Sequence, residues 1–65
     1  MKIGQIYNNF GCKWIVDDIY KVDPETVKAH ELYYNIRYKA HVIEAPDGYK
    51  GIREIDAGYK REALA

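Results

Sequence analysis

The sequence is poor in the features that stabilise or anchor many very small proteins. It has one cysteine, Cys12, so no disulfide can form within the chain, and a lone thiol suits a reducing compartment. No apolar run approaches the roughly 20 residues that a membrane span requires. Residues 1–5 also lack the apolar segment of a signal peptide. We therefore expect a cytoplasmic protein with no membrane partner.

The chain also lacks net charge, because ten Lys and Arg residues balance ten Asp and Glu residues. A strong non-specific nucleic-acid binder needs an excess of cations to neutralise phosphates. The charges are uneven, however: residues 17–31 are mildly acidic and residues 37–61 mildly basic. Such a distribution suits the steering of a protein partner. A chain of 65 residues forms one small domain, 1–65, with a limited core.

No motif for catalysis or metal binding is present. His30, His41 and Cys12 lack the close paired spacing of a zinc site. Asp17 and Asp18 are neighbours, and neighbours on a strand point to opposite faces unless a bulge intervenes. They are therefore interpreted as solvated charges or as a bulge, and not as paired catalytic carboxylates. We expect no metal, no cofactor, no catalytic residue and no enzymatic activity.

The most informative feature is an unbroken alternation from Leu32 to Val42. A period of two is typical of a half-buried strand, because successive side chains point to opposite faces. The side expected to face the core is Leu32, Tyr34, Ile36, Tyr38, Ala40 and Val42. The side expected to face solvent is Tyr33, Asn35, Arg37, Lys39 and His41.

The preceding residues predict two strands and a short intervening segment. We expect strands over 2–7 and 13–22, joined by a turn at 8–11. In the second strand a bulge at Asp17-Asp18 would bring Ile19 into phase with Trp14; without a bulge, Ile19 faces outward. Residues 23–32 are either irregular or begin with one helical turn over 24–29, capped by Asp23.

Pro46-Asp47-Gly48 predicts a tight hairpin after the long strand. A three-residue loop would place Ala45 opposite Tyr49 and His41 opposite Arg53. A bulge near Arg53-Glu54 would then turn the next apolar residue inward. We expect residues 56–59 to break this strand and residues 60–64 to form a short last strand.

Four or five short strands in so small a chain favour closure into a barrel, which removes open sheet edges. Trp14 is expected in its core, the alternative being an exposed anchor for a partner. The predicted class is all-β: a small antiparallel barrel with at most one short helical turn.

Two segments resemble a known family. Gly4-Gln5-Ile6-Tyr7, the Gly11 turn and Trp14-Ile15-Val16 are similar to the start of small prokaryotic SH3-like barrels, including the KOW type. The Gly-containing hairpin followed by residues 55–59 is similar to their last strands. The resemblance implies an SH3-like barrel. In size and tyrosine content the chain also resembles accessory proteins of bacteriophages, many of which bind and block one host protein.

The outward side of the alternating strand is the best candidate binding surface, since Tyr and Arg are enriched at protein interfaces. The alternative interpretation is that this side is an ordinary strand face in contact with solvent. The candidate partner-binding residues are Tyr33, Asn35, Arg37, Lys39, His41, Tyr49 and Arg53. We expect a non-enzymatic interaction module that inhibits a host protein; the alternative is a small nucleic-acid-binding barrel, and homodimerisation is compatible with either.

Overall fold

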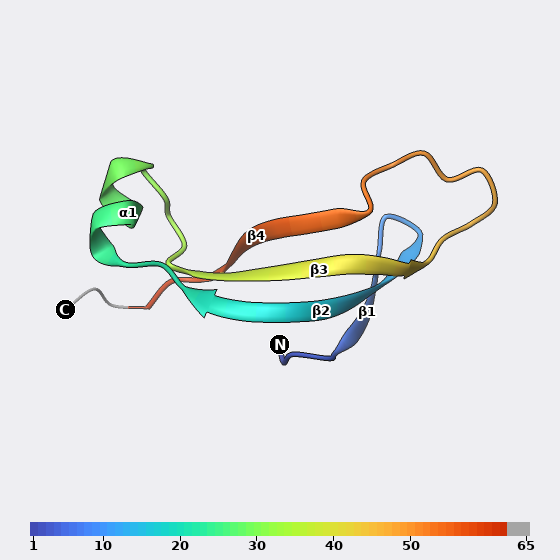
Figure 1. Cartoon of the computed structure of the whole chain (residues 1–65), viewed down its shortest axis with the longest axis horizontal. Coiled ribbons are helices and arrows are strands. Elements are labelled where there is room, and N and C mark those ends of the chain that lie inside the picture. Colours follow the sequence, from blue (N-terminus) through green and yellow to red (C-terminus); the bar gives the residue numbers. More distant parts are fainter. Residues whose placement is uncertain (63–65) are drawn as a thin grey trace.

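The computed structural model describes residues 1–62 and shows one antiparallel sheet with a single short helix. The strands are β1 (Ile6–Asn9), β2 (Cys12–Lys21), β3 (Ile36–Glu44) and β4 (Glu54–Lys60), and they lie in the order β1-β2-β3-β4. Helix α1 (Pro24–Ala29) lies at one end of the long strands, and the loop 45–53 at the other (Figure 1). The all-β class is confirmed. In the described residues, no helix has the length and apolarity to cross a membrane.

The sheet is not closed as a barrel, which corrects the predicted architecture. Strands β1 and β4 lie at opposite edges and do not pair with each other. The molecule measures 45 × 21 × 13 Å, and its Cα radius of gyration is 13.7 Å. A compact chain of this length would have a radius of about 11 Å. The residues that the structure describes therefore form an open, elongated sheet of four strands.

A two-residue loop joins β1 to β2. Phe10 (φ 52°) and Gly11 (φ 74°) both have positive φ, as a type I′ turn requires. At Phe10 the turn holds the backbone of a residue with a bulky side chain in the left-handed region, where residues other than glycine and asparagine are uncommon. Strand β1 consequently runs to Asn9, later than the predicted 2–7.

Of the two alternatives for β2, the one with a bulge is the one that forms. Val16 pairs with Ala40 and Asp18 pairs with Lys39, so Asp17 is the extra residue. Beyond it Ile19 pairs with Tyr38 on the same side of the sheet as Val16 and Ala40. Figure 1 shows β1 and the start of β2 at a steep angle to the long strands, as expected of a bulged and more strongly twisted strand.

The helical alternative for residues 24–29 is the one that forms. Asp23 caps α1: its Oδ1 accepts a hydrogen bond from the backbone N–H of Thr26 at 2.8 Å, and Pro24 occupies the first turn. Val27 is buried. The short helix ends at His30, and Glu31 follows with a positive φ of 52°.

The hairpin after β3 differs from its prediction. The turn itself forms, with Gly48 at φ 79° and the Tyr49 N–H donating to the Pro46 carbonyl at 3.1 Å. The register nevertheless differs from the prediction, because His41 lies opposite Glu54 and not Arg53, and the Val42 N–H donates to the Arg53 carbonyl at 2.9 Å. The loop is long because it folds back onto the core, and that tertiary contact overrides the shortest turn.

Strand β4 runs through the residues expected to break it. Ile55 pairs with Ala40 and turns inward without the predicted bulge at Arg53-Glu54. The break near 56–59 appears instead as a register shift, since Ile36 pairs with Lys60 and Arg37 with Gly58. Of the predicted strand 60–64, Arg61 and Glu62 are not in a strand, and 63–65 lie outside the described residues.

The core lies on one side of the sheet, here called the core face. Trp14 is 0% exposed and packs with Cys12 and Ala40. Its indole N–H donates to the Asn9 carbonyl at 2.9 Å, which confirms the core position of this residue. The partly buried side chains around this cluster are Tyr7, Tyr38, Val42, Ala45, Tyr49 and Ile55.

Candidate protein-binding face

The opposite side of the sheet, here called the polar face, carries most of the charged side chains of the three long strands. The pairings Tyr20–Arg37, Asp18–Lys39, Lys39–Asp56 and His41–Glu54 place the following residues on it: Asp18, Tyr20, Arg37, Lys39, His41, Glu54 and Asp56. Paired residues of antiparallel strands share a face. The predicted outward orientation of Arg37, Lys39 and His41 is therefore confirmed.

Arg37 is bonded within the molecule. Its guanidinium Nε lies 3.4 Å from the Asp56 carboxylate, and its Nη2 donates to the Asp56 backbone carbonyl at 3.1 Å. The Tyr20 hydroxyl donates to the same carboxylate. Burial, followed by the hydrogen bond to Asp56, raises the pKa of Tyr20 above its usual value. These contacts join side chains from three neighbouring strands.

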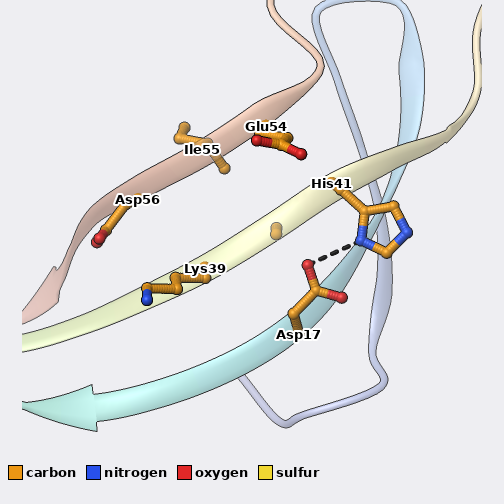
Figure 2. Close-up of a pocket in the computed structure, with 7 residues that line it drawn as sticks. Asp17, Lys39, His41, Glu54, Ile55 and Asp56 are labelled. Carbon is orange, nitrogen blue, oxygen red and sulfur yellow. Dashed lines mark hydrogen bonds and ion pairs between the residues drawn. The ribbon is translucent and has the colours of Figure 1, made fainter.

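His41 pairs with the carboxylate of the bulge residue. The distance from His41 Nδ1 to Asp17 Oδ2 is 2.8 Å, and both side chains are about half exposed. Figure 2 shows Asp17 pointing from β2 toward the His41 ring on β3. The pair borders an open depression of about 510 Å³ lined also by Lys39, Glu54 and Asp56. The bulge thus aims one of two adjacent carboxylates at the imidazole.

Lys39 lies on the polar face with its positive charge accessible to solvent. It is exposed, and within residues 1–62 it forms no ion pair. Its ammonium lies 5.5 Å from the centre of the Tyr20 ring. A cation above an aromatic ring at this distance gains a modest attraction while its charge stays in contact with water.

Two exposed tyrosines extend the polar face toward the end that carries α1. Tyr33 and Tyr34 are 64% and 42% exposed, and their rings meet edge to face with centroids 4.9 Å apart. Tyr34 lies against Gly58, where an added Cβ would come within 2.5 Å of its ring. The guanidinium of Arg61 sits 4.9 Å from the Tyr33 ring centre. Gly58 is opposite Arg37, so the tyrosine pair adjoins the Arg37–Asp56 contacts.

Asn35 does not belong to the candidate binding surface, which corrects its predicted outward position. It is 1% exposed. Its Oδ1 accepts from the Glu62 N–H at 2.7 Å, and its backbone carbonyl accepts from the Val22 N–H at 2.8 Å. The alternation holds only from Ile36 onward, because Asn35 precedes β3 and ties together the segments that enter and leave the sheet.

Tyr49 and Arg53 also lie away from the polar face. Tyr49 packs against the core cluster, and its hydroxyl donates to the Ile52 carbonyl at 2.8 Å. Arg53 Nη2 donates to the Tyr49 carbonyl at 3.2 Å. Arg53 was expected opposite His41, and Tyr49 opposite Ala45 as an extension of the same surface, because the predicted hairpin was too tight. In the folded chain they stabilise the loop 45–53 over the core face.

The sequence alone did not single out Tyr20, Tyr34 or Asp56 as members of this surface. Tyr20 and Asp56 come from strands on either side of β3, so only the register joins them. Tyr34 was assigned to the core by alternation, whereas it lies over Gly58 on the polar face. The bulge considered at Asp17-Asp18 is the sequence feature from which the position of Tyr20 on the polar face could have been inferred.

In residues 1–62 no group of three or more His, Cys, Asp or Glu side chains is arranged to hold a metal ion. Compared with known proteins, the chain matches no family model, no curated protein and no solved structure. The geometry of the two faces therefore carries the functional argument.

Proposed function

We propose that this chain is a non-enzymatic protein-interaction module that binds its partner through the polar face and the adjoining Tyr33–Tyr34 pair. The observation that carries the proposal is the exposed tyrosine pair seated on Gly58, beside the bonded Arg37–Asp56 contacts. Tyrosine and arginine are enriched at interface hot spots. Side chains already held in place lose less entropy on binding.

The charges of the polar face support a protein partner over a nucleic acid. Four carboxylates, from Asp17, Asp18, Glu54 and Asp56, stand beside only two permanent cations, from Arg37 and Lys39. A phosphate backbone would be repelled by this excess. A protein surface of mixed charge with a basic patch would be steered toward it.

In this proposal the protein acts in the cytoplasm and inhibits a host protein by covering its surface, as the resemblance to phage accessory proteins suggests. The sheet supplies a rigid platform, Tyr33 and Tyr34 enter the partner surface, and Lys39 pairs with a carboxylate of the partner. A relation to small SH3-like proteins is part of the same proposal. It rests on the N-terminal segment Gly4-Gln5-Ile6-Tyr7, the Gly11 turn and Trp14-Ile15-Val16.

One observation favours the alternative, a nucleic-acid-binding domain. Arg61 lies over Tyr33, and Lys60 and Lys21 are close enough to Glu62 to form ion pairs at the same end. Aromatic rings flanked by cations stack on unpaired bases. Phosphate binding would weaken steeply with added salt, whereas an interface built on tyrosine would respond weakly.

The test is a pull-down from bacterial lysate with the tagged chain, with and without nuclease, followed by affinity measurements with the purified partner. We expect one stoichiometric protein that survives nuclease. Lys39→Glu and Tyr33→Ala should weaken its binding at least tenfold, a loss of about 1.4 kcal/mol or more. Lys50→Glu, the same charge reversal at an exposed residue of the loop 45–53, should bind like the wild type.

Equal affinities for Lys39→Glu and Lys50→Glu would remove the polar face from the proposal. Capture of nucleic acid, with protein bands lost after nuclease, would replace the proposal with its alternative.

A further inference from the structure

The two edges of the sheet differ in how they present their backbone groups. An edge strand carries a row of unpaired N–H and C=O groups that can pair with another strand unless side chains or bulges block it. The strand order makes β1 one edge and β4 the other. Their side-chain surroundings determine which edge is open.

The β4 edge is blocked. The Val42 N–H donates to the Arg53 carbonyl at 2.9 Å, so in the alternating ladder the outward backbone groups of β4 belong to Glu54, Asp56 and Gly58. Arg37 Nη2 already donates to the Asp56 carbonyl at 3.1 Å, and Tyr34 lies against Gly58. A second strand would have to break the hydrogen bond from Arg37 to the Asp56 carbonyl and pass beside the Tyr34 ring.

The β1 edge is open. The two-residue turn makes Asn9 and Cys12 a hydrogen-bonded pair, so the outward groups belong to Ile6 and Asn8. Within residues 1–62, no side chain bonds to these groups. The side chains of Ile6 and Asn8 are themselves exposed. The edge therefore presents four free backbone groups and an apolar side chain.

We propose that this edge binds the β1 edge of a second copy of the chain in antiparallel orientation, which joins the two sheets into one. The register follows from the free groups: Ile6 pairs with Asn8 of the second copy, Asn8 with its Ile6, and Tyr7 with its Tyr7. All four outward groups of each strand are then bonded, so the edge is complementary to itself.

Charge and composition favour a second copy as the occupant. Strand β1 reads Ile-Tyr-Asn-Asn and has no charged side chain, and the whole chain has zero formal net charge, so two copies bring no like-charge repulsion. Two further large apolar residues that flank β1 in the chain are exposed: Ile3 and Phe10. Small chains with limited cores commonly gain stability by association.

The contact is short, so we expect a reversible dimer in the class of interfaces below about 1,200 Å². It uses none of the residues assigned above to the polar face, and it leaves that face open on both copies. The inference therefore stands independently of the proposed function.

The experiment is sedimentation velocity over a roughly 100-fold range of concentration, with wild type and two variants. Ile6→Lys places a charge at the open edge, where lysine blocks strand pairing. Ile52→Lys is the matched control, because Ile52 and Ile6 are 53% and 55% exposed. We expect wild type and Ile52→Lys to dimerise as concentration rises, and Ile6→Lys to remain monomeric.

Amide hydrogen exchange on the wild type gives a second measurement. The Ile6 and Asn8 N–H groups should be protected at high concentration and exchange freely at low concentration. A wild type that stays monomeric, an Ile6→Lys variant that dimerises as well as wild type, loss of the dimer in both variants, or unprotected Ile6 and Asn8 amides would each overturn the proposal.

Discussion

The core face and the polar face belong to the same strands, yet different interactions organise them. On the core face Trp14 is fully enclosed, and one hydrogen bond satisfies its indole. On the polar face, charged groups contact each other while remaining in water, as in the Arg37–Asp56 and His41–Asp17 pairs. Burial stabilises in proportion to apolar area, whereas exposed ion pairs add little. We therefore expect the core face to contribute most of the stability of the fold, and the polar face to contribute less.

The largest effect should come from truncating the core face. Trp14→Ala removes the central side chain of the cluster and leaves the Asn9 carbonyl without its donor. We expect a loss of about 3–5 kcal/mol in the free energy of unfolding, measured by urea denaturation. In a domain this small that loss unfolds much of the population. A Trp14→Ala protein as stable as wild type would show that the sheet does not depend on this cluster.

A smaller effect is expected on the polar face. Arg37→Ala removes the contacts with Asp56 on the neighbouring strand, and the loss of bonds to a charged, partly exposed group should cost about 1–2 kcal/mol. Lys39→Ala is the control on the same strand and face, with an expected change within about 0.5 kcal/mol. Chemical denaturation of both variants compares them directly. If the two variants lose equal stability, the Arg37 contacts do not brace the strands.

The smallest effect at neutral pH concerns Tyr7 on the core face. Its hydroxyl is buried and has no hydrogen-bond partner among the described residues. Tyr7→Phe should therefore leave stability unchanged or raise it by up to about 1 kcal/mol. A clear destabilisation in a thermal melt would indicate that the hydroxyl is bonded in solution.

Because of Tyr7, the stability of the core face should also depend on pH in the alkaline range. Burial, and then the neighbouring Tyr38 hydroxyl, raise the pKa of Tyr7 from 10.0 to about 12. The folded chain therefore holds this proton more tightly than the unfolded chain. The resulting stabilisation is complete below about pH 10 and is lost as the pH rises toward 12. Tyr7→Phe should flatten that decline in denaturation curves recorded across the range.

Local signals predicted local structure well. Asp23 followed by Pro24 indicated a capped helical turn as one of two alternatives, and that alternative forms, because capping depends only on groups within a few residues. The phase slip at Asp17-Asp18 indicated a bulge as one of two alternatives, and the bulge is the one that forms. The alternation over 36–42 predicted the faces of β3, since a strand that packs on one side must alternate.

Signals that depended on distant contacts failed. Pro46-Asp47-Gly48 predicted a tight hairpin, and the turn forms, but Ala45 and Tyr49 pack on the core cluster and lengthen the loop. The resulting register separates Arg53 from His41. Asn35 fits the alternation as an outward residue, yet a hydrogen bond to the Glu62 N–H places it inside.

The sequence by itself determined the all-β class and the outward direction of Arg37, Lys39 and His41, and it narrowed the segments 17–18 and 23–32 to two alternatives each, because these features depend on neighbours within a few residues. Only the tertiary structure decided that the sheet stays open, that Tyr34 crosses to the polar face over Gly58, and that Arg37 blocks one edge while the other stays free. These outcomes depend on which strands meet and in what register, and register is set by the packing of residues far apart in the chain.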